Sequence, residues 1–94
     1  MKILVCCANG AGTSMMMGMK VKQAFKELGV DAKVDHTSLS EGKNTWRPYD
    51  AIFCSTAFVS NFVDAEKAGK PVIGMKNILS VEEAKEKIQE KNLV

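Results

Sequence analysis

The part of this chain best suited to chemistry is a cysteine followed by two glycines and two hydroxyl side chains. In order, its residues are Cys7, Ala8, Asn9, Gly10, Ala11, Gly12, Thr13 and Ser14. Glycine lets a backbone approach an anion closely, and the free N–H groups and dipole of a helix N-terminus attract negative charge. The segment therefore predicts a loop that holds a phosphoryl group without a cationic side chain.

Cys7 is the predicted nucleophile. Cysteines near helix N-termini favour the thiolate, which is the reactive form, so we expect Cys7 to be reactive at neutral pH. The hydroxyls of Thr13 and Ser14 either bind phosphoryl oxygens or only cap the helix, and both interpretations stay open. Adjacent side chains of a strand point to opposite faces, so Cys6 is expected to be a small buried residue, and Cys54 a core residue.

Known phosphate-binding patterns differ from this segment at defining positions. The ATP-binding pattern G-x-x-x-x-G-K-[ST] needs a lysine before Thr13 or Ser14, and the dinucleotide pattern G-x-G-x-x-G needs a glycine where Met15 stands. A phosphatase loop of the form C-x5-R-[ST] needs an arginine at position 13, where its guanidinium would grip the phosphoryl group. Nucleotide binding and rapid phosphoester hydrolysis are therefore disfavoured, and a phosphate carrier remains.

Composition excludes several other classes. Ninety-four residues with 46% hydrophobic and 26% charged residues predict one globular domain over residues 1–94. A net charge of +2 from scattered lysines predicts no nucleic-acid binding, and the apolar runs are too short for a membrane helix. Three cysteines and one histidine support neither a disulfide framework nor a metal site. We expect no cofactor, and a cytoplasmic protein with free thiols.

Short apolar runs alternate with segments of helical periodicity. Strands are predicted at residues 2–7, 32–37, 50–55 and 71–75, helices at 13–28, at 58–68 and after Ser80, and a loop with one helical turn at 38–49. This order predicts an α/β fold, a three-layer αβα domain with a four-stranded parallel sheet in the order 2-1-3-4. The sheet is Rossmann-like, with a phosphatase-like loop after its first strand.

Ligands of such sheets lie beyond the carboxyl ends of the strands. The loop after the third strand therefore joins the Cys7 loop, and Ser55 and Thr56 become secondary site candidates. Lys76 and Asn77, after the fourth strand, are predicted to form an ordinary loop at the same edge, with contact to an acidic partner or to the phosphate as the alternative. His36 is expected at the surface of an edge strand, and Asp35 and Asp50 to be structural. The methionines Met15, Met16, Met17 and Met19 are expected to fill the core, with one or two of them in a partner-docking face as the alternative.

Several stretches resemble a known family. They are residues 3–15, 19–21, 55–56 and 72–80, and together they span most of the chain. In them the chain is similar to the IIB components of the lactose, galactitol and ascorbate branches of the bacterial sugar phosphotransferase system. Residues 9–12 and 74–80 look most like the ascorbate type. The family has one cysteine at the loop entrance, whereas this chain has Cys6 and Cys7.

The resemblance implies a phosphotransferase that forms a phosphocysteine. A IIA phosphoprotein would deliver the phosphoryl group from its phosphohistidine to Cys7, and a membrane IIC subunit would present the sugar, of the ascorbate type, that receives it. Two other functions stay open: a low-molecular-weight cysteine phosphatase or arsenate reductase, and a thiol redox module built on Cys6 and Cys7. Arginine is missing from position 13, and geometry disfavours a disulfide between adjacent cysteines.

Overall fold

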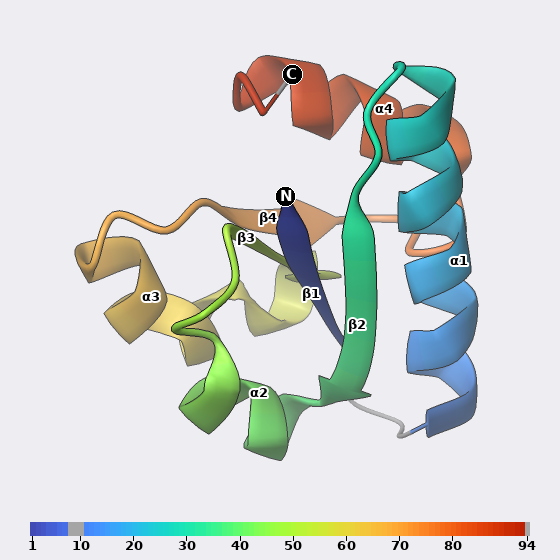
Figure 1. The fold of residues 1–94 in the computed structure, drawn as a ribbon. Coiled ribbons are helices and arrows are strands. Elements are labelled where there is room, and N and C mark those ends of the chain that lie inside the picture. The colour runs from blue at the N-terminus through green and yellow to red at the C-terminus, as the bar shows by residue number, and fades with distance from the viewer. Residues whose placement is uncertain (8–10, 94) are drawn as a thin grey trace.

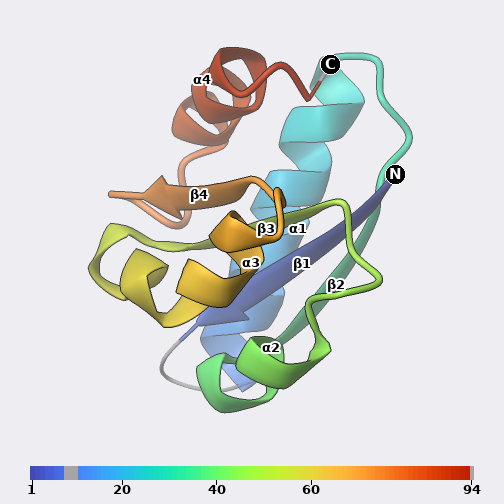
Figure 2. The same ribbon diagram turned by 90° about the vertical axis from the view of Figure 1, so that its left-hand side faces the viewer.

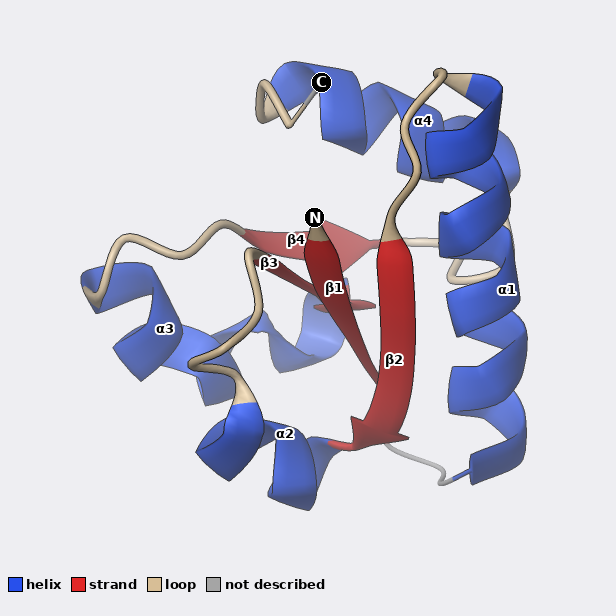
Figure 3. Cartoon of the chain, viewed as in Figure 1, coloured by secondary structure: helices blue, strands red, loops and turns tan. Residues whose placement is uncertain are grey.

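Four parallel strands form a single sheet in the computed structural model, which describes residues 1–7 and 11–93, with the backbone alone for 11–14. The strands are β1 (Lys2–Cys7), β2 (Lys33–Ser38), β3 (Ala51–Ser55) and β4 (Val72–Met75), in the order β2-β1-β3-β4. All three pairings are parallel, with β1 between β2 and β3 (Figure 3). The predicted α/β fold and strand order are confirmed.

Helices cover both faces of this sheet, as predicted for a three-layer domain. On one face lie α1 (Ala11–Glu27) and α4 (Val81–Glu90), and on the other lie α2 (Leu39–Thr45), the 3-10 helix η1 (Thr56–Phe62) and α3 (Val63–Lys67). Figures 1 and 2 show α1 and the pair α2 and α3 on opposite sides of the strands. Ser80 accepts a hydrogen bond from the Glu83 backbone N–H and caps α4 as expected.

The central strand β1 is buried on both faces. Ile3 and Val5 pack toward α1, whereas Leu4 and Cys6 pack toward α2 and η1, and all four side chains are at most 1% exposed. A strand covered on both sides reads as a continuous apolar run, which is why the segment was recognisable from its sequence. The alternation also sends Cys6 and Cys7 to opposite faces of the sheet.

Residues 38–49 hold more helix than the sequence suggested. Helix α2 spans seven residues where we expected a loop with one turn, and the Ser38 hydroxyl caps it by accepting from the Glu41 N–H at 3.3 Å. Gly42 is the residue of α2 that is buried. A helix held to the sheet through a glycine shows no apolar stripe, so periodicity could not reveal it.

The predicted helix over residues 58–68 is divided in two. It begins as the 3-10 helix η1 and continues as the short α3. A Cβ on Gly74 of β4 would come within 2.6 Å of Val59 and 3.1 Å of the Thr56 Cα, so η1 lies against the sheet where only glycine leaves room. Phe62 and Ala65 are buried, whereas Val63 is 41% exposed.

A substitution at Gly42 tests the close approach of α2 to β1. A Cβ at this position would collide with the Cys6 sulfur, although it would only touch the Cys6 Cβ at 3.5 Å and Phe62 at 3.4 Å. We expect Gly42→Ala to cost about 1–3 kcal/mol of unfolding free energy through overpacking. The double variant Cys6→Ala/Gly42→Ala should recover most of that loss, because the sulfur is gone.

Urea unfolding of wild type, both single variants and the double variant measures this coupling. A double variant whose cost equals the sum of the two single costs would show that the contact between α2 and β1 is looser than described.

Candidate functional site

The ends of three neighbouring strands form the candidate site. Cys7 is the last residue of β1 and is paired in register with Ser38, the last residue of β2. Val5 of β1 pairs with Phe53 of β3, so Ser55, two residues further along β3, ends next to Cys7. The Cys7 side chain is 6% exposed. The structure therefore places this thiol at the carboxyl edge of the sheet, where a parallel α/β protein binds its ligands.

Helix α1 begins at Ala11, four residues after Cys7. Its first turn lies at the same edge as the end of β1 (Figure 3), so the dipole of a 17-residue helix has its positive end on the side of the thiol. Ala8, Asn9 and Gly10 lie outside the described residues, and so do the side chains of residues 11–14. The loop contacts of these residues, including those of Thr13 and Ser14, stay predictions.

The other two cysteines have a different environment. Cys6 and Cys54 lie on the face covered by α2 and η1, with no exposed surface. Burial raises the pKa of the Cys6 thiol to about 12, and the neighbouring Cys54 and Cys7 thiols add to the shift. Burial also raises the pKa of Cys54 to about 12. Both are held as neutral thiols at neutral pH, and the prediction that they are buried core residues is confirmed.

The loop after β3 is organised by Ser55. Its hydroxyl oxygen accepts a hydrogen bond from the Ala57 N–H at 3.4 Å and caps η1. Thr56 is exposed at the start of η1. These two residues lie beside the end of β1, where we expected them, and their contact with a phosphoryl group stays a prediction.

Glu83 organises the loop after β4, a role that sequence reasoning missed. Its carboxylate accepts from the backbone N–H groups of Lys76 at 2.6 Å and Asn77 at 2.7 Å. Bonds to a carboxylate are stronger than neutral ones, so this loop is held against the first turn of α4. The backbone N–H groups of Lys76 and Asn77 are therefore already hydrogen-bonded within the chain, which supports the interpretation of this segment as an ordinary loop. The only signal in the sequence was an acidic residue near a helix start.

Other polar side chains with possible roles are structural or peripheral. Asp35 accepts from the Tyr49 hydroxyl at 2.8 Å, and Asp50 accepts from the Lys2 backbone N–H at 2.7 Å. Both acids therefore hold neighbouring segments of the fold together, as expected. His36 is exposed on the edge strand β2, in agreement with its predicted surface position.

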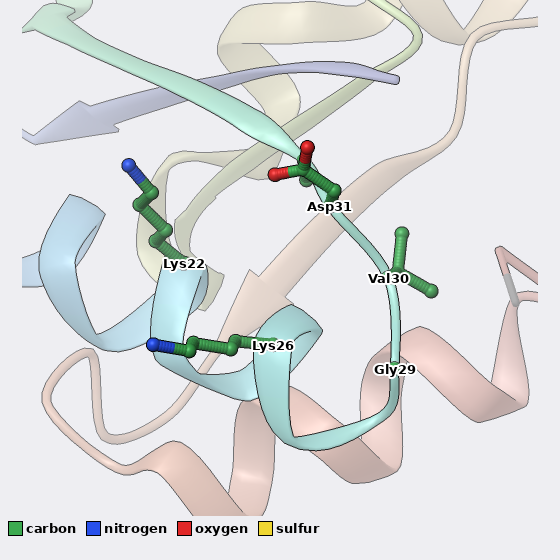
Figure 4. A pocket seen from close by; sticks show the side chains of 6 residues that line it. Lys22, Lys26, Gly29, Val30 and Asp31 are labelled. Atoms are coloured by element: carbon green, nitrogen blue, oxygen red, sulfur yellow. The ribbon is translucent and has the colours of Figure 1, made fainter.

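One hollow of about 410 Å³ lies away from Cys7, where α1 ends and the chain turns toward β2. Lys22 and Lys26 extend from the helix on one side of it, and Asp31 and Val30 come from the connecting segment (Figure 4). Within the described residues, no group of three or more histidine, cysteine or acidic side chains gathers to hold a metal ion. No helix in that same part of the chain is long and apolar enough to cross a membrane.

The fold and the edge thiol define a class, the small parallel α/β proteins that carry a cysteine at the end of the first strand, ahead of the first helix. A family model described as the lactose/cellobiose-specific IIB subunit of the PTS, the phosphotransferase system, matches residues 2–90. The chain therefore belongs to this family of IIB subunits, and the resemblance noted in its sequence is confirmed. It is a component of a phosphotransferase system for sugar transport.

Curated relatives and solved structures agree with this assignment. An ascorbate-specific EIIB component of Mycoplasma pneumoniae is 36% identical over 84 residues, which cover 89% of this chain and 86% of the relative. Its counterpart in Escherichia coli O157:H7 is 34% identical over 79 residues, which cover 84% of this chain and 76% of the relative. A lactose-specific IIB domain of Streptococcus pneumoniae has a TM-score of 0.72 at 20% sequence identity, and the match covers 96% of this chain and 95% of that domain. That similarity concerns the fold.

The three thiols should differ sharply in reactivity. Because Cys6 and Cys54 are fully buried and have raised pKa values, we expect limiting iodoacetamide at pH 7.5 to modify Cys7 first in the folded protein. Peptide mass mapping after timed quenching measures the order, and the same reaction in urea gives the intrinsic reactivity. Equal labelling of Cys6 and Cys7 in the folded chain would contradict the separation of the two faces.

Proposed function

We propose that the chain is a phosphocarrier that holds its phosphoryl group on Cys7. The observation that carries this proposal is the contrast between the cysteines. Cys7 ends the central strand at the carboxyl edge, ahead of α1, whereas the Cys6 and Cys54 side chains lie in the core layer of α2 and η1 with no exposed surface. Membership of the IIB family supports a transfer role.

The first step takes the phosphoryl group from a phosphohistidine of a IIA protein. The Cys7 sulfur attacks phosphorus, the S–P bond forms as the N–P bond breaks, and the electron pair leaves with the imidazole nitrogen. The proton lost by the thiol is balanced by the one that the departing imidazole takes up. Backbone N–H groups of the loop, with the hydroxyls of Thr13 and Ser14, stabilise the phosphoryl oxygens, because such transfers depend on positioning and electrostatics.

The second step passes the group to a sugar presented by a membrane IIC subunit. A hydroxyl oxygen of the sugar attacks phosphorus and loses its proton, while the S–P bond breaks and the sulfur leaves as a thiolate. The names of the relatives that are 34% and 36% identical support ascorbate as the acceptor. The chain acts in the cytoplasm in this proposal, where thiols stay reduced.

The competing functions have less support. A cysteine phosphatase would need an arginine to grip the phosphoryl group, and position 13 is threonine. A redox module would join Cys6 to Cys7, but these side chains belong to opposite faces of β1. No observation favours the phosphatase or the redox module over the phosphocarrier.

Intact mass spectrometry tests the carrier directly. The chain is incubated with phosphoenolpyruvate, the general phosphotransferase proteins and a cognate IIA, as wild type and as Cys6→Ser, Cys7→Ser and Cys54→Ser. We expect a gain of one phosphoryl group, about 80 Da, in every form except Cys7→Ser.

The remaining outcomes are equally informative. Loss of the gain only in Cys6→Ser would move the acceptor by one residue. A wild-type chain that gains nothing beside a demonstrably phosphorylated IIA would reject the carrier, and turnover of an aryl phosphate would then favour the phosphatase.

A further inference from the structure

Helix α1 presents a run of methionines to solvent. Met15 is 50% exposed, Met16 49% and Met19 64%, so the prediction that these side chains fill the core is wrong. Among the described residues only three other large hydrophobic side chains are exposed to a similar degree, and they are scattered. Single exposed apolar residues are normal on a soluble protein, whereas a cluster marks an interaction surface.

The fold does not need these three methionines. The buried face of α1 is formed by Met17, Val21, Ala24 and Phe25, each with no exposed surface. Phe25 also meets Phe53 of the sheet edge to face, with ring centroids 6.1 Å apart. The helix is therefore attached to the sheet by one face, and Met15, Met16 and Met19 occupy the opposite one.

This exposed face is close to the candidate site. Helix α1 begins at Ala11, and a rise of about 1.5 Å per residue places Met19 roughly 12 Å along its axis from that start. A specific protein interface buries about 800 Å² on each partner, which corresponds to a patch about 30 Å across. A protein large enough to cover Cys7 therefore also reaches the methionines.

The charged side chains of α1 that follow the methionines are lysines until the last residue of the helix. Lys20, Lys22 and Lys26 follow them along α1, and the first acid in the helix, Glu27, already binds Lys85 at 3.1 Å. Met16, Met19, Lys20 and Gln23 line a surface hollow of about 240 Å³. A complementary partner would place an apolar projection in this hollow and carboxylates against the lysines.

We propose that Met15, Met16 and Met19, with Lys20 at their edge, form the docking face for the phosphohistidine-bearing IIA protein. This inference rests on the proposed function and names the contact surface for its first step. The IIA surface around the phosphohistidine then has an apolar projection with acidic residues beside it. Methionine suits this contact because its unbranched, polarisable side chain adapts to the shape of a partner.

The rate of phosphorylation by IIA, measured against IIA concentration, tests the docking face. The test variant is Met16→Gln/Met19→Gln, and the matched control is Val63→Gln, which removes an exposed apolar side chain of α3 on the opposite face of the sheet. We expect the KM for phosphorylated IIA to rise about tenfold in the test variant and to change less than about twofold in the control. The final gain of one phosphoryl group per chain should be unchanged in both.

A charge reversal at the edge of the face gives a second measurement. Lys20→Glu should raise the same KM at low salt, and the difference from wild type should shrink as ionic strength increases. Circular dichroism checks that the variants keep their helices.

Three results would overturn the docking face. One is a wild-type KM in the methionine variant, and another is an equal rise in the control variant. The third is a wild-type chain that forms a dimer and a methionine variant that is monomeric but has the wild-type KM for phosphorylated IIA. That result would assign the face to a second copy of this chain. The proposed function fails separately, because a wild-type chain that accepts no phosphoryl group rejects both proposals, whereas a phosphorylated wild type with a normal methionine variant rejects only the docking face.

Discussion

The burial of β1 on both faces is the constraint on which the rest of the structure depends. A central strand that packs on two helical layers must alternate its side chains strictly between them, and a slip of one residue would exchange the layers. The alternation separates two adjacent cysteines that are chemically identical. Cys6 enters the layer of α2 and η1 and is held as a neutral thiol, while Cys7 ends the strand at the edge where β2 and β3 also end.

Two glycines set how closely the helices approach this sheet. Gly42 lets α2 reach the Cys6 sulfur, and Gly74 of β4 lets η1 approach the sheet through Thr56 and Val59. The first contact keeps water from the Cys6 thiol, and the second holds η1, which begins directly after Ser55, against β4. Glycine acts here through the absence of a side chain, since neither residue has a positive φ.

The sequence predicted the strands within one residue of their observed ends, because a buried parallel strand has a simple signature. Helix α2 was missed since its contact with the sheet runs through a glycine, which contributes nothing to an apolar stripe. The error over the methionines has another cause. Residues 15–19 read Met-Met-Met-Gly-Met, so apolar side chains point in every direction around the helix, and periodicity cannot tell which one faces the sheet. Burial in the core between α1 and the sheet decides it, and it selects Met17.

In the proposed function, neither the sequence nor the fold of this chain contains the whole active site. The two hollows near α1 are lined by residues other than Cys7. Electrostatic stabilisation of a phosphoryl group is strongest where water is excluded, and in the proposed function a docked partner completes this exclusion around a thiol that is itself only 6% exposed. In the proposed function, this chain therefore supplies one half of the active site and its partner supplies the other. The exposed methionines of α1 are the adaptable apolar surface that binds this partner.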